Sequence, residues 1–395
     1  MKARYQYRFY PTDAQKQSLV RLFGCVRVVW NDALAICNNS EKNPTTGDLQ
    51  KLVITQAKRT DERAWLCEVS AIPLQQSVAD LGMAFKNFFE SCKGKRKGRH
   101  IGYPRFKKRV NTQSARLTRG GFSIKGDRVY LAKIGTVNPI WSRELQSAPS
   151  SVTVLKDCAD RYFLSFVVDI EPIRSAAENQ SIGIDLGIKT FAFMSDGSIA
   201  KSPDYSKLDR KLRKRARNLA RQTKGSARWN KTRVRIAKLN NQIADKRKDF
   251  LHKLSTKLVR ENQALVVEDL NVSGMMKNRK LSRAIAQQGW AEFRTLCEAK
   301  SDKYGRDFRI VNRWEPTSQV CSDCGYRWGK LDLSIRSVLC LNCGAEHDRD
   351  ENAARNIEKV GMGHRQTLNG HGATVRRSRS QVALKCQESP LMRGR

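Results

Sequence analysis

The feature that most constrains how this chain can fold is a doubled cysteine motif near its C-terminal end. Two CxxC pairs are separated by 15 residues, each directly followed by a glycine: Cys321 and Cys324, then Cys340 and Cys343. Four thiolates at this spacing are typical of a zinc ribbon, in which each pair lies on a tight turn that glycine permits. A redox pair or disulfides are the alternatives, but the doubling favours one structural zinc ion whose four ligands leave no position for a catalytic water. We expect nearby His347 to be a surface or supporting residue and not a ligand.

The net charge narrows the class of partner. The 395 residues include 75 Lys and Arg against 38 Asp and Glu, a formal charge of +37. Such an excess predicts binding to a polyanion, and nucleic acid is the usual one. No stretch reaches the roughly 18 consecutive apolar residues of a membrane helix, and the first residues alternate instead of forming an apolar signal core. Because the cysteines outside the motif are scattered singly, we expect a soluble, intracellular chain. A length of 395 residues is too great for one ordinary core, so two to four domains are expected.

The basic excess is concentrated between residues 207 and 260. There, 20 Lys and Arg stand against three acids, and a thin apolar stripe with Gly225 in its path predicts two long helices joined by a turn. A solvated helix pair is the simpler interpretation, but a solvated face normally mixes charges of both signs. We therefore predict that the pair follows phosphate backbones. The residues expected to contact nucleic acid are Arg210, Lys211, Arg213, Lys214, Arg217, Arg233 and Arg235.

Three acidic residues stand where a strand or a helix is expected to end or begin. Asp185 lies in GIDLG, Glu268 closes the apolar run ALVVE, and Asp350 opens the helix that continues as NAARNI. Carboxylates from separate elements can converge on Mg²⁺, and two such ions can activate a water and stabilise the leaving oxygen of a phosphodiester. Each acid also has a simpler alternative. Asp185 could lie in a turn and Glu268 in an ion pair with an arginine. Asp350 could be a helix N-cap, as could Asp348.

Hydrophobic periodicity outlines the remaining elements. Alternating apolar residues predict a first strand, and Thr12, with Gln15 three residues on, predicts a capped helix after it. Helical patterning recurs through residues 46–92. Residues 114–170 instead alternate and are punctuated by turns, which suggests the hairpins of a small sheet or barrel. After Ile357 the periodicity is lost, which predicts a mobile tail.

Taken in order, these motifs resemble those of the TnpB (OrfB) family of insertion-sequence proteins, compact RuvC-type nucleases related to type V CRISPR effectors. The order GIDLG, VVEDL, CxxC-x15-CxxC and HDRDENAARNI carries the resemblance. Further matching segments are YRFYPTDAQ, GCVRVVWNDAL, IGYPRFKKR, KDFLHKLSTKLV, GWAEF and PTSQVCSDCG. The resemblance covers the chain to about residue 358.

The resemblance implies a multi-domain α/β fold. An RNase H-like (RuvC) nuclease domain would carry the zinc ribbon as an insertion, beside a wedge-type β-barrel domain and a helical recognition domain. The expected bounds are 1–11 with 110–172 for the wedge-type barrel, 12–109 for the recognition domain, 173–318 with 346–360 for the nuclease domain, 319–345 for the ribbon, and 361–395 for the mobile tail.

The resemblance also implies a function. The matching positions Asp185, Glu268 and Asp350 are all acidic, so an active DNA endonuclease is expected, with two Mg²⁺ ions (or Mn²⁺ in their place) and one structural Zn²⁺. The expected partners are a transposon-derived guide RNA and double-stranded DNA cut beside a short adjacent motif, which the family's recognition helix approaches near Gln75. We expect a monomeric ribonucleoprotein in the prokaryotic cytoplasm, associated with the nucleoid when bound to DNA, and no membrane partner.

Other functions remain open from the residues alone. GIDLG also resembles the first phosphate loop of the actin-like ATPases, although no second glycine-rich phosphate turn follows residue 200. A catalytically silent RNA-guided DNA-binding protein, or a zinc-ribbon nucleic-acid-binding protein, is the main alternative, and it predicts substituted acids where this chain keeps all three. A transposase of the DDE type would catalyse strand transfer, which the family resemblance argues against.

Overall fold

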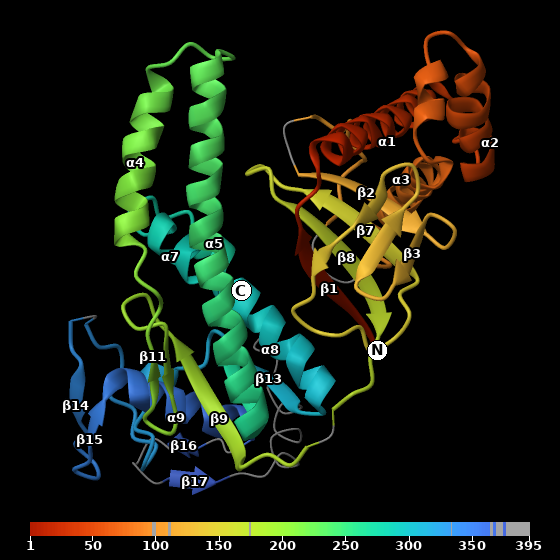
Figure 1. Ribbon diagram of the computed structural model, residues 1–395. Coiled ribbons are helices and arrows are strands. Elements are labelled where there is room, and N and C mark those ends of the chain that lie inside the picture. Colours follow the sequence, from red (N-terminus) through yellow and green to blue (C-terminus); the bar gives the residue numbers. More distant parts are fainter. Residues whose placement is uncertain are drawn as a thin grey trace, which may run out of the picture. The chain divides into compact units, whose positions relative to one another are not determined.

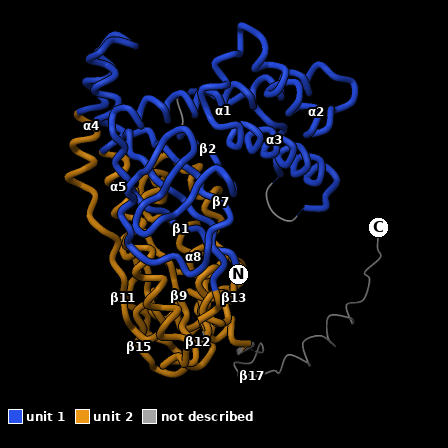
Figure 2. Tube along the Cα trace, turned by 45° about the vertical axis from the view of Figure 1, so that its right-hand side comes forward, with its two compact units in different colours: residues 1–170, 215–238 blue, residues 171–214, 239–395 orange. Residues whose placement is uncertain are grey.

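The computed structural model describes residues 1–96, 100–109, 112–173, 175–332 and 334–363, and the backbone of two short strands, 366–368 and 374–376 (Figure 1). The chain forms two compact units, which Figure 2 distinguishes by colour: residues 1–170 with 215–238, and residues 171–214 with the chain from 239 onward. Most of the predicted tail, 361–395, lies outside the described residues. Of the helices that the structure describes, none has the length and apolar composition that crossing a bilayer requires.

The first unit contains an antiparallel sheet with the strand order β2-β7-β8-β1-β6. β1 (Lys2–Phe9) pairs along its whole length with β8 (Tyr162–Asp169), and its alternating aromatic residues are buried, as predicted. The remaining strands of the sheet are β2 (Gln113–Thr118), β6 (Pro139–Ile140) and β7 (Ser151–Lys156). A separate three-stranded sheet is formed by β3 (Phe122–Lys125), β4 (Arg128–Leu131) and β5 (Gly135–Val137).

The implied β-barrel is not closed in the described part of the chain. The outer strands of the larger sheet, β2 and β6, are not hydrogen-bonded to each other. β6 has two residues, which is too short to carry the sheet around to β2, and the strands between residues 122 and 137 pair among themselves instead. The expectation of a barrel was therefore wrong, whereas the expectation of a small sheet built from hairpins is confirmed.

Helices fill the rest of this unit's core. α1 (Asp13–Asn39) begins at the predicted capping box, in which Thr12 Oγ1 accepts from Gln15 N and Gln15 Oε1 accepts from Thr12 N. The segment 46–92 is not one helix. It contains α2 (Thr46–Gln50), a π-helical turn (Lys51–Gln56), two 3₁₀ turns (Ala57–Arg59 and Ala64–Glu68) and α3 (Ala71–Cys92).

The second unit contains a mixed sheet with the strand order β11-β10-β9-β12-β13. Its antiparallel part is β9 (Asn179–Leu186), β10 (Ala192–Met194) and β11 (Ile199–Ala200). β12 (Asn262–Glu268) then pairs parallel with β9, and β13 (Asp307–Val311) pairs parallel with β12. Parallel pairing needs long crossovers, and helices provide both of them.

Helices cover both faces of this sheet. α8 (Trp290–Tyr304) and part of α5 pack on the face of Ile184 and Val267, where Phe293 is fully buried. α9 (Arg349–Gly361) packs on the opposite face, where Ile357 contacts Val266. Two short helices, α6 (Val272–Met275) and α7 (Ser282–Gln288), lead from β12 into α8.

The basic segment forms two helices, as predicted. α4 (Ser206–Ala220) and α5 (Ala227–Glu261) are joined by a turn in which Gly225 adopts φ of 89°, a left-handed conformation that favours glycine. The prediction of a helix pair is thereby confirmed.

The cysteine motif lies between β13 and α9. It contains a 3₁₀ turn (Thr317–Gln319) and the hairpin of β14 (Ser337–Leu339) with β15 (Glu346–Asp348). The chain runs directly from β15 into α9. Beyond α9, β16 (Gln366–Leu368) pairs antiparallel with β17 (Thr374–Arg376).

Candidate active site

Strand register places Asp185 beside Glu268. β9 and β12 run parallel, and the last residues in their register are Ile184 and Val267, so the next residue on each strand is one of the two acids. Residues at the same level of neighbouring strands project to the same face of a sheet. Both carboxylates therefore project together from the carboxyl edge of the central strands, the edge at which open α/β sheets bind ligands.

Close packing of α9 brings the third acid to this face. Gly183 and Asp185 are two residues apart on β9 and so project to the same side. A Cβ atom at Gly183 would lie 2.2 Å from the backbone oxygen of Ala354, so α9 rests directly on the strand. Asp350 precedes Ala354 by four residues, about 6 Å along the helix, which nearly equals the roughly 6.6 Å between Gly183 and Asp185 along the strand. The packing thus brings Asp350 close to Asp185.

The pKa of Asp185 records the proximity of the three acids. Burial, followed by the negative charges of Glu268 and Asp350, raises this pKa from 3.8 to about 7. A hydrogen bond from the backbone of Leu186 and the positive charge of Arg349 lower it, but they do so more weakly. A bound cation would lower the free-energy cost of ionising such a half-buried cluster of carboxylates, because the cation favours the charged forms.

Glu268 is the last residue of β12, which lies between β9 and β13. Burial and the charge of Asp269 raise its pKa. Among the described residues Glu268 forms no ion pair, so its simpler alternative, a pair with an arginine, is not found. It is the next residue, Asp269, that binds arginines. Asp269 Oδ1 accepts from Arg294 Nη1 at 2.6 Å, and Asp269 Oδ2 accepts from Arg313 Nη2.

The two candidate cap residues have different roles. Asp348 is the N-cap of α9, because its Oδ1 accepts from the backbone N–H groups of Asp350 at 2.9 Å and Glu351 at 3.0 Å. The Asp350 carboxylate is therefore not needed for capping. Its Oδ2 accepts from Arg336 Nη1 at 2.8 Å, so a metal at this carboxylate would compete with an ion pair.

The distances between potential ligand atoms distinguish the three acids from the cysteine cluster. Within the described ranges, one set of three or more potential ligands has all of its ligand atoms within 4.8 Å of one another, and that set is the four cysteines. The carboxylates of Asp185, Glu268 and Asp350 are close enough to interact electrostatically, but they do not meet this distance. Three different elements, β9, β12 and α9, supply them.

The four cysteines have the geometry of a structural zinc site. The Sγ atoms of Cys321 and Cys343 are 3.7 Å apart, and those of Cys324 and Cys340 are 3.5 Å apart. A zinc ion with Zn–S bonds of about 2.3 Å in a tetrahedron requires sulfurs roughly 3.8 Å apart, so the donor set fits. Both following glycines have positive φ, 77° at Gly325 and 74° at Gly344, as the predicted turns require.

His347 supports the cluster from inside the ribbon. Its side chain is buried, and its Nε2 lies 3.1 Å from Cys321 Sγ. An imidazole N–H at this distance can donate to a thiolate and orient it. His347 is therefore not a surface residue, and a supporting role is the remaining expectation.

The predicted nucleic-acid contacts are exposed. The basic residues singled out on α4 and α5 are all exposed: Arg210, Lys211, Arg213, Lys214, Arg217, Arg233 and Arg235. None of them forms an ion pair with an acid that the structure describes. Gln75 is also exposed, on α3. Their side chains are thus available to a partner, and their contact with nucleic acid stays a prediction.

Sequence reasoning missed the arginines that surround Asp269. Asp269 is visible in VVEDL, but Arg294 lies 25 residues away and Arg313 lies 44 residues away. Neither arginine belongs to a recognisable motif, and the chain is rich in arginine throughout. The parallel pairing of β12 with β13 brings Arg313 to Asp269, and the packing of α8 on the sheet brings Arg294 there. Local sequence carries no signal for either contact.

Three family models match the chain. One named OrfB_IS605 and described as "Probable transposase" matches residues 165–279, one described as "Cas12f1-like, TNB domain" matches 290–357, and one described as "Helix-turn-helix domain" matches 1–43. In this structure the last of these segments contains β1 and α1, a strand and a single long helix.

Named relatives match over most of their length. A Streptomyces pristinaespiralis protein named "Putative RNA-guided DNA endonuclease" is 41% identical over 92% of this chain and 90% of the relative. An Escherichia coli protein named "Putative RNA-guided DNA endonuclease InsQ" is 30% identical over 90% of this chain and 92% of the relative. A solved structure titled "Cryo-EM structure of the Cas12f1-sgRNA-target DNA complex" overlaps with a TM-score of 0.49 at 15% identity, over 87% of this chain and 81% of that one.

Proposed function

Since the chain belongs to the TnpB (OrfB) family of insertion-sequence proteins, we propose that it is an RNA-guided DNA endonuclease that hydrolyses phosphodiester bonds by a RuvC-type, two-metal-ion reaction. The observation that carries the proposal is the placement of Asp185 and Glu268 at the same level of the paired strands β9 and β12, with α9 packed on the face from which they project. A protein with an excess of positive charge gathers three half-buried carboxylates there.

The chemistry of these residues suits Mg²⁺, which prefers carboxylate oxygens, or Mn²⁺ in its place. Two such ions, when bound, would activate a water and stabilise the leaving oxygen. Asp185 and Glu268 would hold ions from adjacent strands, and Asp350 from α9. The Arg336 guanidinium, which now pairs with Asp350, would be displaced to a second oxygen or to a phosphate of the DNA.

The cysteine cluster has a different role in the proposal. Cys321, Cys324, Cys340 and Cys343 would bind one Zn²⁺ with all four positions filled, so this ion would hold the ribbon together without taking part in hydrolysis. Because β15 of the ribbon continues directly into α9, the zinc-bound fold would also fix where α9 begins.

The partners follow from the family and from the charge. Relatives named RNA-guided DNA endonucleases support a transposon-derived guide RNA and a double-stranded DNA target with an adjacent motif near Gln75. The exposed cations of α4 and α5 would contact the phosphate backbone of one of them. We further propose that a single copy acts, and that the domains divide as 1–11 with 110–172, 12–109, 173–318 with 346–360, and 319–345.

The test has two steps. RNA that copurifies with the protein is sequenced to identify the guide, and a DNA library is then cut with the purified complex. Asp185→Ala, Glu268→Ala and Asp350→Ala are each expected to abolish cleavage while the bound RNA is retained, because each removes a metal ligand alone. Asp302→Ala removes an exposed carboxylate from α8 and is the control that should cut normally.

Two outcomes would count against the proposal. Full cleavage by any one of the three variants would remove that residue from the metal site. A wild-type complex that binds a guided target and leaves it uncut in Mg²⁺ and in Mn²⁺ would instead indicate a silent RNA-guided binding protein.

A further inference from the structure

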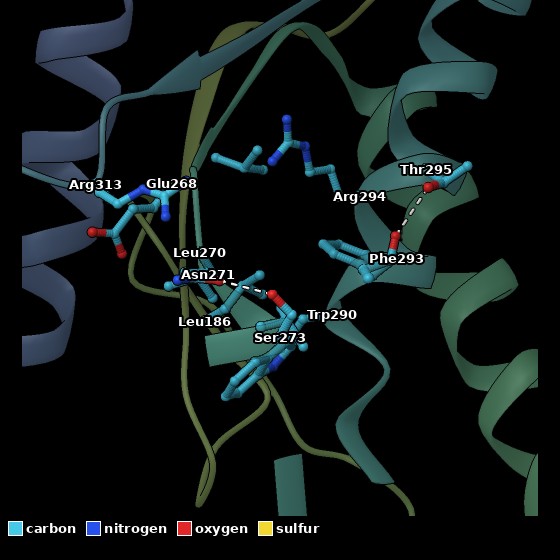
Figure 3. Close-up of a pocket in the computed structure, with 13 residues that line it drawn as sticks. Leu186, Glu268, Leu270, Asn271, Ser273, Trp290, Phe293, Arg294, Thr295 and Arg313 are labelled. Carbon is cyan, nitrogen blue, oxygen red and sulfur yellow. Dashed lines mark hydrogen bonds between the residues drawn. The ribbon is translucent and has the colours of Figure 1, made fainter. Parts of the chain in front are cut away.

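A pocket of about 360 Å³ opens beside Glu268, between the edge of the second sheet and α8. Leu186 and Val267 line it, and each is the strand neighbour of a catalytic candidate. Glu268 itself also lines the pocket. The pocket therefore opens at the same edge as the three acids and reaches one of them, although Leu186 and Val267 project to the opposite face of the sheet from Asp185 and Glu268. Figure 3 shows Arg294 and Phe293 on one side of the open space and Leu186 with Leu270 on the other.

The lining of the pocket divides into an apolar floor and a polar rim. The floor is formed by Leu186, Val267, Leu270, Val272, Trp290 and Phe293, and the last two are buried aromatic rings. The rim carries the amide of Asn271, the hydroxyls of Ser273 and Thr295, and two arginines. An apolar cavity of a few hundred Å³ with a small number of polar groups at its mouth is typical of a site for an organic ligand.

The two rim arginines determine the charge of that ligand. Arg294 and Arg313 both bind the single carboxylate of Asp269, so these three residues keep one net positive charge. The carboxylate of Glu268, which lines the same pocket, offsets that charge unless it holds a cation. A guanidinium has five N–H donors, and most of those on the two arginines are not used by Asp269. Asp269 therefore holds the two guanidinium groups in place at the mouth of the pocket and leaves N–H donors for an anion. The planar guanidinium of arginine can bind a phosphate through two parallel hydrogen bonds.

We propose that this pocket is a subsite for one unstacked nucleotide of the DNA strand that is being cut. The inference rests on the proposed function and deepens it. The base of that nucleotide would enter the apolar floor, Arg294 and Arg313 would hold its phosphate, and the neighbouring phosphate would reach the carboxylates across the same edge. The pocket thereby fixes the position of the strand relative to the site of hydrolysis, and its largely apolar floor suits the face of any base.

The test combines a pocket-filling variant with an abasic scan. Ala291 is exposed on α8 and lines the pocket, so Ala291→Phe fills it without removing any functional group. Ala299 is exposed two turns further along α8 and does not line the pocket, so Ala299→Phe is the matched control. Thr295→Phe is a second filling variant from the exposed rim. The cleavage rate of each complex is then measured on guided targets in which single nucleotides near the cut are replaced, one at a time, by an abasic unit.

For the wild type we expect one abasic position to slow cleavage about tenfold, since base–aromatic contacts contribute on the order of 1–3 kcal/mol. Ala291→Phe should slow cleavage of the intact target about tenfold, and the abasic unit should then cause no further loss. Ala299→Phe should behave as the wild type. Guide-RNA binding and melting temperature serve to show that each variant is folded.

Several results would overturn the proposal. Wild-type rates from both filling variants, or an abasic effect that persists undiminished in them, would show that no base enters the pocket. Inhibition by thymidine 5′-monophosphate without any sensitive abasic position would assign the pocket to a free nucleotide. A wild-type complex that cuts no target defeats the proposed function itself, and the subsite with it, whereas normal cutting without a sensitive position defeats the subsite alone.

Discussion

Replacing Asp185 by asparagine should stabilise the magnesium-free protein, and more so at pH 8 than at pH 5. Asp185→Asn keeps the shape of the side chain and removes its charge. The pKa of Asp185 is raised to about 7 from 3.8, so the folded protein binds this proton more tightly than the unfolded chain does. The ionised carboxylate is thus a cost that the folded protein bears in the absence of a cation.

The sign and the size follow from proton linkage. The unfolded chain loses the proton near pH 3.8 and the folded protein near pH 7, so the stability of the wild type falls as pH rises between these values and is level above them. The full difference in pKa lowers the free energy of unfolding by roughly 4 kcal/mol, of which about 2.6 kcal/mol is lost between pH 5 and pH 8. Because Asp185 is only half-buried and Glu268 titrates beside it, we expect about 1–2 kcal/mol of that change to be observed.

The assay is thermal unfolding of wild type and variant at pH 5, 6, 7 and 8, in buffer that lacks magnesium but retains zinc. The melting temperature of Asp185→Asn should exceed that of the wild type by a margin that widens with pH. Asp302→Asn removes a charge from an exposed position on α8 and is the control, whose margin should not change with pH. Adding Mg²⁺ should raise the melting temperature of the wild type and do little for Asp185→Asn, since a ligand stabilises only the fold that binds it.

A margin that stays constant from pH 5 to pH 8 would show that Asp185 is an ordinary exposed acid. Destabilisation of Asp185→Asn at pH 8 would contradict the reasoning more strongly, because it would mean that the carboxylate is stabilised by its surroundings even without metal. In either case the three acids would not form the cluster of closely spaced carboxylates on which the proposed metal site depends.

Four other predictions test separate parts of the structure. Metal analysis should find about one zinc per chain, and Cys340→Ser should lose it together with the fold of the ribbon. Gly183→Ala should destabilise the second unit by about 1–3 kcal/mol or more and abolish cutting, because the added Cβ would meet α9. Gly24→Ala is the control: Gly24 lies in α1 with open space around it, so this change should stabilise the first unit by about 1 kcal/mol. Arg210→Glu with Arg217→Glu should weaken binding of the guide RNA or of the target DNA, and should reduce the salt dependence of that binding in a filter-binding titration. Asp269→Asn should slow single-turnover cleavage several-fold, since it releases Arg294 and Arg313, while the zinc content stays unchanged.

The parts of the fold that could be predicted are those that depend on neighbours in sequence. The capping box of Thr12 and Gln15, the turn at Gly225 and the glycine turns of the cysteine pairs are all set within a few residues. Such local patterns need no knowledge of the rest of the chain. The three acids could be singled out from their places where a strand or a helix was expected to end or begin. Each kept a simpler alternative there, and it was the family resemblance that implied a single metal site.

The parts that could not be predicted depend on contacts distant in sequence. The open sheet of the first unit follows from the two-residue length of β6, and alternation alone does not predict how many residues of a strand will pair. The segment after Thr46 breaks into π-helical and 3₁₀ turns although its apolar spacing favours a helix, because tertiary packing overrides periodicity. The burial of His347 against Cys321 likewise needs the folded ribbon.

The ribbon and the third acid are mechanically connected through one residue. Asp348 pairs with Ser337 across the β14–β15 hairpin, and its side chain caps α9 by accepting from Asp350 N. The same residue therefore belongs to the last strand of the ribbon and to the first turn of the helix that carries Asp350. α9 packs closely on the sheet at two points: Gly183 of β9 lies against Ala354, and Gly361 of α9 lies against Val266. Neither glycine has room for a Cβ atom. With the helix fixed by the sheet and its first turn fixed by the ribbon, Asp350 has little freedom. A structural zinc site placed immediately before a proposed metal ligand would thus make physical sense: it would order the one acid of the three that is not held by a strand.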